Sequence, residues 1–153
     1  MSHALVRCLS LLVLAAPLAS QGPVGTALGS GHGSPVRVAY VSDERVDELF
    51  ELFSAPVDGS ASPLLLSDVL PAAGDVREIQ QVGERVLYRA DQLVDETFEL
   101  FSAPVDGSAP SVHVSGPLVA GGDVDRSFLV GKSQVVFRAD ALVNDRDELF
   151  CAP

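Results

Sequence analysis

The chain contains a long internal duplication. Twelve residues, Phe50 to Ala61, recur without change as Phe98 to Ala109, at an offset of 48 residues. A third copy starts one residue later, because Glu148 to Pro153 repeats Glu99 to Pro104 at every position but one. An identity of this length at a fixed offset is typical of a repeat protein. The chain must therefore fold into similar modules, each of which packs mainly against its neighbours.

The repeat divides the chain into units. The repeated segments place two units at 36–84 and 85–133, followed by a partial third unit at 134–153. Two segments of different composition precede them, at 1–22 and 23–35.

The sequence predicts four short strands in each unit. In the second unit, a run rich in β-forming residues, Arg85 to Ala90, is followed by Phe98 to Val105, which ends at the turn pair Asp106-Gly107. Ser111 to Ser115 then alternates polar and apolar residues, and Asp123 to Val130 gives a fourth strand. Four antiparallel strands in 48 residues match one blade of a β-propeller. We therefore predict an all-β fold of antiparallel four-stranded blades.

A helical repeat is the competing interpretation. Glu44 to Phe53 can be drawn as an amphipathic helix, since Leu49 and Leu52 lie near helical spacing. Pro56 follows closely, however, and a proline disfavours helix in the residue before it. The matching run around Phe98 has the higher strand propensity, so the sequence favours strands.

The repeat resembles a known family. The segment VLYRADQ…FELFSAPVDGS, Val86 to Ser108, is similar to the TolB-type propeller repeat, a relative of WD-repeat blades. The Ser-Pro-Asp-Gly turn usual in that family is replaced here, for example by Val82-Gly83-Glu84, which marks a divergent member. The resemblance covers about 36–153. It implies a β-propeller, a periplasmic location and protein partners in a bacterial cell envelope.

The number of units is low for a propeller. A closed ring needs about four to eight blades, and the sequence shows two units and part of a third. We therefore expect an incomplete propeller with apolar faces and strand edges open to solvent. Further blades of a longer chain, or self-association, would cover them.

Residues 1–22 have the three zones of a secretory signal peptide. Arg7 provides the positive charge of the N-terminal region, Cys8 to Leu18 form the apolar region, and small residues follow where cleavage is expected. The apolar run is about half the length that a membrane span needs, so we expect a cleaved signal-peptide helix and no stable span afterwards. Cleavage between Ala19 and Gly22 would release a periplasmic or secreted protein whose one cysteine is Cys151. The Gly-rich stretch 23–35 reads as a flexible linker.

The charge balance excludes one class of partner. The chain has 10 Lys and Arg against 21 Asp and Glu, a formal net charge of −11. A nucleic-acid backbone needs a basic surface, so we expect no nucleic-acid binding.

Acidic residues recur at matching turns, and one set is a candidate calcium site. Calcium prefers six to eight oxygen ligands, and the candidates in the second unit are Asp91, Asp95 and Glu96. Solvated turn charges explain the same pattern. No cofactor and no catalytic residue is predicted, because the spacing of His113 and Cys151 suggests neither a nucleophile with its base nor a zinc site.

Two functions follow from the resemblance. The first is an exported, non-catalytic propeller-type protein that mediates protein–protein interaction in a bacterial envelope. The alternative is the propeller part of a prolyl-oligopeptidase-like serine peptidase without its catalytic domain. Fold alone does not decide between them.

Overall fold

The structure is a computed structural model that describes residues 6–8, 35–131 and 134–153. All of the regular secondary structure in these ranges is β-strand, which confirms the predicted all-β class. Within the same ranges, no helix has the length and apolarity to cross a membrane.

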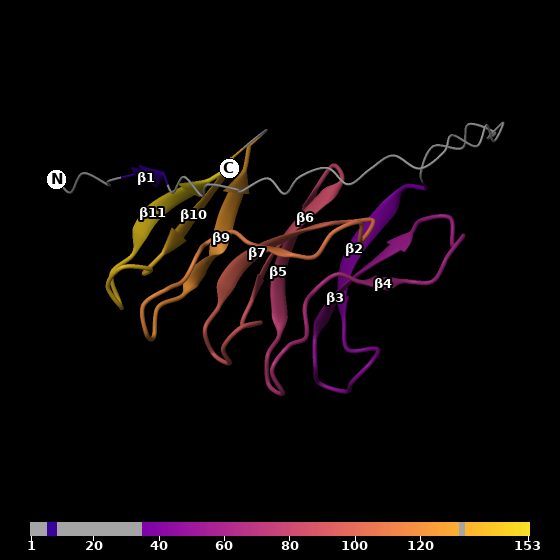
Figure 1. Cartoon of the computed structure of the whole chain (residues 1–153), viewed down its shortest axis with the longest axis horizontal. Helices are drawn as coiled ribbons and strands as arrows, with labels where there is room; N and C mark the ends of the chain where they lie inside the picture. The colour runs from indigo at the N-terminus through magenta and orange to yellow at the C-terminus, as the bar shows by residue number, and fades with distance from the viewer. Residues whose placement is uncertain (1–5, 9–34, 132–133) are drawn as a thin grey trace, which may run out of the picture.

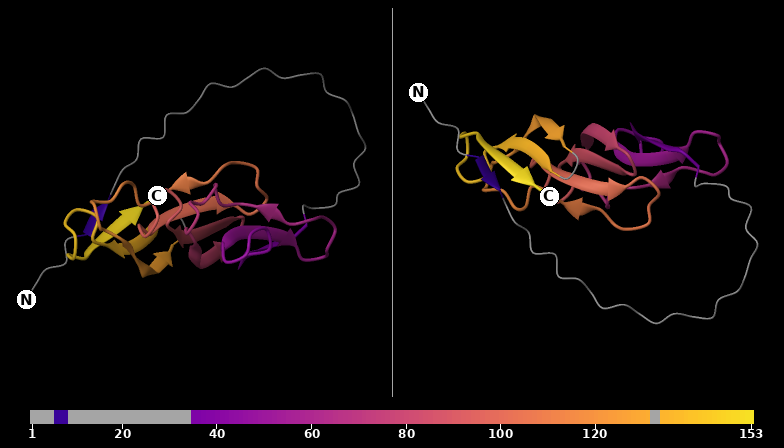
Figure 2. Two further views of the ribbon diagram at one scale, coloured as in Figure 1. Left: turned by 90° about the horizontal axis from the view of Figure 1, so that it is seen from below. Right: turned by 90° about the horizontal axis from the view of Figure 1, so that it is seen from above.

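In the described part of the chain, the strands form three small sheets, arranged in a row along the long axis (Figures 1 and 2). The first sheet consists of β2 (Arg37–Ser42), β3 (Glu51–Pro56) and β4 (Leu64–Leu65). The middle sheet consists of β5 (Val76–Val82), β6 (Arg85–Ala90), β7 (Glu99–Pro104) and β8 (Val112–His113). The third sheet consists of β9 (Val124–Val130), β10 (Val135–Ala139), β11 (Glu148–Ala152) and β1 (Val6–Cys8). All pairs are antiparallel except β1 with β11.

The sheets are displaced along the chain relative to the sequence units. Asp123 to Val130 was expected to be the fourth strand of the second unit, but β9 pairs with β10 in the third sheet. The corresponding strand β5 pairs with β6. The cause is the two-residue turn at Gly83 and Glu84, where Gly83 has a φ of 60°. Such a turn joins β5 and β6 as a hairpin, so the middle sheet takes its first strand from the preceding unit, and the third sheet likewise takes β9.

The middle sheet is packed on both faces. Directly opposed residues of antiparallel strands share a face, so Tyr88 and Phe101 lie on one face and Leu87 lies on the other. Tyr88 and Phe101 belong to a core with residues of the first sheet, and Leu87 and Leu100 belong to a core with residues of the third. Burial raises the pKa of Tyr88 to about 12. Strands β6 and β7 are accordingly buried along almost their whole length.

The same hydrogen bond links each pair of neighbouring sheets. The amide of Val76 donates to the carbonyl of Phe50 at 2.7 Å, and the amide of Val124 donates to the carbonyl of Phe98 at 2.7 Å. The donor and the acceptor are shifted by 48 residues in both cases. The duplication of the sequence thus extends to the contact between modules.

Most of the predicted signal-peptide helix, 1–22, lies outside the described residues, as does the linker 23–35 apart from Pro35. For Val6–Cys8, which fall within that predicted helix, the structure has strand β1 instead. This strand pairs with the edge of β11, in a register that sets Cys8 opposite Cys151. An open strand edge offers unpaired backbone groups to any extended segment that reaches it.

Candidate interaction surface

Three equivalent loops lie along one edge of the row of sheets, at the lower side of Figure 1. They comprise residues 43–50, 91–98 and 140–147, and we call them together the loop rim. Each loop closes with the same hydrogen bond of 3.1 Å, from the amides of Leu49, Thr97 and Arg146 to the carbonyls of Val46, Val94 and Val143. Each also has one non-glycine residue with φ of 60–63°: Glu48, Glu96 and Asp145. The rim therefore repeats one backbone shape three times.

A buried aspartate holds each of the last two loops. Asp91 accepts the amide of Asp75 at Oδ1 (2.5 Å) and the amide of Glu96 at Oδ2 (3.1 Å). Asp140 accepts two backbone amides in the same way, at 2.5 and 2.8 Å. Because a carboxylate that accepts two amides fixes both chain segments, these residues set the shape of the loops.

The calcium candidates do not come together as a metal site. Both oxygens of Asp91 accept backbone amides, and Asp95 and Glu96 are exposed. Among the residues that the structure describes, no group of three His, Cys, Asp or Glu side chains has the arrangement to hold a metal ion. The recurrence of Asp91 in the repeat therefore has a structural cause, the anchoring of a loop.

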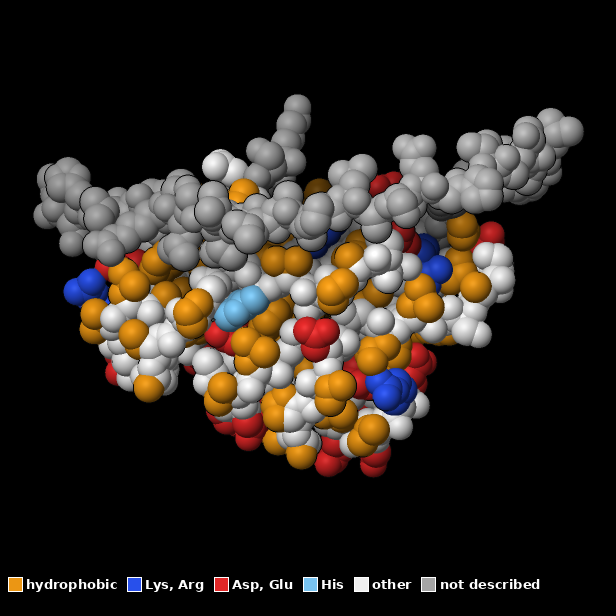
Figure 3. Space-filling view, viewed as in Figure 1, with side chains coloured by type: hydrophobic (Ala, Val, Ile, Leu, Met, Phe, Trp, Pro, Cys, Tyr) orange, Lys and Arg blue, Asp and Glu red, His pale blue; other side chains and the backbone are white. Residues whose placement is uncertain are grey.

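The tips of the rim carry exposed aliphatic side chains that the sequence analysis missed. Five of them are 44–59% exposed: Val46, Leu93, Val94, Leu142 and Val143. Exposed carboxylates stand next to them: Asp47, Glu48, Asp95, Glu96, Asp145 and Asp147. Orange and red side chains both occur along the lower margin of Figure 3. The signal in the sequence was the repeated pairing of a valine with acids, but only the fold shows that the valines face solvent.

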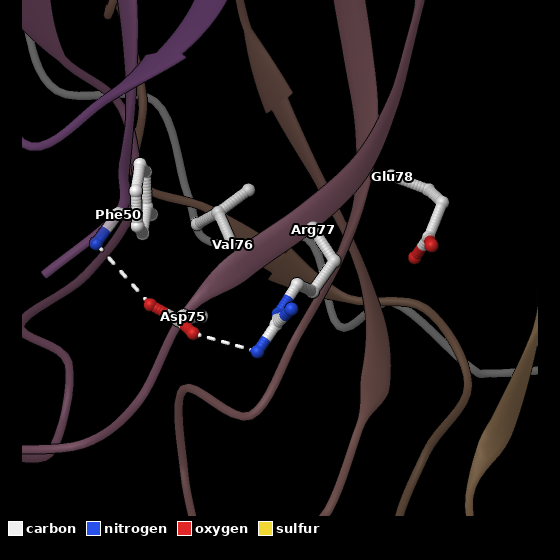
Figure 4. A pocket seen from close by; sticks show the side chains of 5 residues that line it. All are labelled: Phe50, Asp75, Val76, Arg77 and Glu78. Atoms are coloured by element: carbon white, nitrogen blue, oxygen red, sulfur yellow. Dashed lines mark hydrogen bonds and ion pairs between the residues drawn. The ribbon is translucent and has the colours of Figure 1, made fainter. Parts of the chain in front are cut away.

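Two hollows open between the sheets beside the rim. The first, of about 470 Å³, is lined by Phe50, Asp75, Val76, Arg77 and Glu78 (Figure 4). In it Asp75 accepts the amide of Phe50 at 3.3 Å and pairs with the guanidinium of Arg77 at 2.8 Å. The second, of about 370 Å³, is lined by Arg89, Val124 and five aspartates: Asp123, Asp125, Asp140, Asp145 and Asp147. Acidic groups therefore extend from the rim into the space between sheets.

Arg89, the arginine that lines the second hollow, makes contacts that hold the structure together. Its guanidinium lies 4.0 Å from the centre of the Phe98 ring, and Nε donates to the carbonyl of Val124 at 2.6 Å. A further guanidinium nitrogen pairs with Glu78 at 3.2 Å. Arg89 thus joins the middle sheet to the third sheet, and the hollow keeps an excess of negative charge.

One glutamate of each repeat is a second feature that the sequence analysis missed. In Glu51, Glu99 and Glu148, the Oε2 atom is buried and has no hydrogen-bond partner within the described structure. The Oε1 atoms pair with Arg45 (3.1 Å), His113 (3.2 Å) and Arg146 (2.7 Å). Burial raises the pKa of Glu99 and lowers the pKa of His113. Burial therefore shifts the pKa of each group of the Glu99–His113 pair in the direction that disfavours its charged form.

His113 lies near both a serine and a carboxylate, without the geometry of a catalytic triad. Its Nε2 atom is 3.1 Å from Ser115 Oγ and 3.2 Å from Glu99 Oε1, so both partners meet the same ring nitrogen. A triad places them on opposite nitrogens. Ser115 is also buried and accepts the amide of Leu100 at 3.1 Å. This contact organises the middle sheet.

Comparisons of the chain with protein-family models, with curated proteins and with solved structures find no match. The proposals below therefore depend on the geometry of the chain and on its sequence.

The anchoring role of Asp91 predicts a clear contrast with Asp95. Asp91→Ala leaves two amides without their acceptor, and each unsatisfied buried group costs about 1–3 kcal/mol. We expect the free energy of unfolding in urea to fall by about 2–4 kcal/mol, whereas Asp95→Ala, at an exposed site, changes it by less than about 0.5 kcal/mol. Calcium chloride should leave the unfolding midpoint unchanged. Equal costs for the two variants would contradict the assignment.

The buried Glu99 predicts a pH-dependent stability. Its raised pKa means that the folded chain binds this proton more tightly than the unfolded chain, whose carboxyl titrates near 4.5. The stability of the parent therefore falls, relative to Glu99→Gln, as the pH rises above about 4.5. We expect a thermal midpoint of Glu99→Gln that exceeds that of the parent at pH 7.5 and converges with it near pH 4. Glu84→Gln, at an exposed turn, is the control and should differ from the parent equally at both pH values.

Proposed function

We propose that the chain is an exported, non-catalytic protein of β-propeller type, and that its loop rim binds another protein in a bacterial cell envelope. One observation carries the proposal. Three copies of the same loop present exposed aliphatic side chains, flanked by carboxylates, along a single edge of the molecule. An exposed apolar strip with a polar border is typical of a protein-binding surface.

The arrangement of the sheets supports the propeller interpretation. The three sheets follow one another at the period of the repeat, and each packs face to face on the next. The middle sheet has four antiparallel strands, the content of one blade. Loops on the rims of such a stack are free to vary and to bind, because the core does not depend on their tips.

The chemistry of the rim supports one kind of partner. Burial of the aliphatic tips would supply binding free energy, while the acids around them favour lysine and arginine on the opposing surface. The net charge of −11 would steer a basic partner toward the chain and repel a nucleic acid. The partner that fits is a protein surface with aliphatic residues bordered by basic ones.

The location is inferred from the first segment of the sequence. Arg7, the apolar run Cys8 to Leu18 and the small residues after it have the order of a signal peptide. Together with the resemblance of Val86 to Ser108 to TolB-type repeats, this supports a partner in the bacterial envelope.

Selection from a displayed library of random peptides tests whether the loop rim binds such a partner. The parent should enrich peptides that combine aliphatic with Lys and Arg residues. The triple variant Val46→Ser, Val94→Ser, Val143→Ser should lose at least tenfold of that enrichment. A matched triple variant away from the rim, Val57→Ser, Val82→Ser, Val112→Ser, should keep it, since these valines are similarly exposed. Equal loss in both triple variants, or no enrichment by the parent, would refute the proposal.

Export is tested by the mass of the protein produced in a Gram-negative host. We expect the chain in the periplasmic fraction, with a new N-terminus created by cleavage between Ala19 and Gly22. Leu14→Arg, which interrupts the apolar run, should leave the full-length chain in the cytoplasm. A parent chain that keeps Met1 and stays in the cytoplasm would rule out this part of the proposal.

A further inference from the structure

The two interfaces between the sheets are built alike. In the first, Tyr88 and Phe101 of the middle sheet share a core with Ala39 and Leu52 of the first sheet. In the second, Phe137 and Phe150 of the third sheet share a core with Leu87 and Leu100 of the middle sheet. The aromatic rings stack in pairs, with centroids 5.5 and 5.6 Å apart. One sheet thus presents an aromatic pair to an aliphatic face of the sheet before it.

The first sheet carries a third aromatic face that no described sheet covers. Tyr40 and Phe53 stack with centroids 5.7 Å apart, at the positions that Tyr88 and Phe101 hold in the middle sheet. Neither ring belongs to either core, although Phe53 is only 3% exposed, so the open part of this face is formed by Val38, Leu65 and the partly exposed Tyr40. Val38 on this face is 49% exposed, whereas its counterpart Val86 is completely buried. We call Val38, Tyr40, Phe53 and Leu65 the aromatic end face.

The third sheet carries the matching aliphatic face. Leu149 is opposite Arg138 on β10 and points away from the Phe137–Phe150 pair. It is partly exposed, whereas its counterpart Leu100 is completely buried. The Arg138 side chain is 56% exposed, and its counterpart Arg89 is 10% exposed because it crosses to the next sheet. We call Val136, Arg138 and Leu149 the aliphatic end face.

We propose that these two end faces bind each other between two copies of the chain, head to tail. Within the described residues, each end face has the side chains of one half of an interface that the chain already forms twice. A second copy supplies the missing half for both faces. Two copies provide six sheets, a number within the four to eight that close a propeller. The assembly would join two loop rims on one ring.

The mass of the purified full chain in solution, measured by light scattering after size-exclusion chromatography, tests the assembly. We expect twice the mass of one chain. Val38→Glu on the aromatic end face and Leu149→Glu on the aliphatic end face should each yield the single-chain mass, because a buried unpaired charge disrupts either interface. Val112→Glu, on the middle sheet and 52% exposed, is the matched control and should keep the double mass.

Mixing the two variants tests whether the aromatic end face of one copy binds the aliphatic end face of the other. The Val38→Glu copy keeps an intact aliphatic end face, and the Leu149→Glu copy keeps an intact aromatic end face. An equimolar mixture should therefore recover a one-to-one complex that neither variant forms alone. Circular dichroism verifies that each variant is folded, and Arg138→Glu, at an already exposed side chain, replaces Leu149→Glu if that variant unfolds.

Three results would overturn the proposal: a single-chain mass for the parent, a double mass for the folded single variants, or dissociation of Val112→Glu. The mass of the assembly in solution does not depend on whether the loop rim binds a partner. A parent of single-chain mass that still enriches basic peptides would refute the assembly and leave the proposed function in place.

Discussion

Face-to-face packing between sheets is the interaction on which the structure depends. Each of the two cores pairs stacked aromatic rings on one sheet with aliphatic side chains on the preceding sheet, and the residues that do this are copies of one another. A three- or four-stranded sheet of this size cannot cover both of its faces, so no module is expected to be stable alone. The middle sheet contributes to both cores for this reason, and each end sheet to one.

This packing also positions the surface proposed to bind a partner. The cross-sheet bonds of Val76 and Val124 lie next to the loops, and Asp91 and Asp140 tie two of those loops to the first strands of their sheets. The tips are left free of the core, which allows aliphatic side chains to face solvent beside carboxylates. A change in sheet packing would therefore move the rim, whereas a change at a tip would leave the core intact.

Much of the fold follows from the sequence. The duplication, the turn residues and the β-forming runs predicted the strand class and the approximate strand positions, because these depend on local chemistry. The grouping of strands was missed, since it depends on which of two connections is a tight hairpin, here Gly83-Glu84. The role of Asp91 was missed as well, because acids that recur at the same place in each repeat give the same sequence pattern whether they bind a metal or backbone amides. The burial of Glu99 and the exposure of Val94 depend on how the sheets pack, which the neighbouring residues in the sequence do not determine.

Amide hydrogen exchange at Val76 and Val124 tests the stacking of sheets most directly. Both amides donate to a carbonyl of the preceding sheet, so we expect them to exchange slowly, at similar rates, and only with the global unfolding of the chain. Exchange of either amide at the rate of an unstructured peptide, while β6 and β7 stay protected, would show that the modules do not stack face to face.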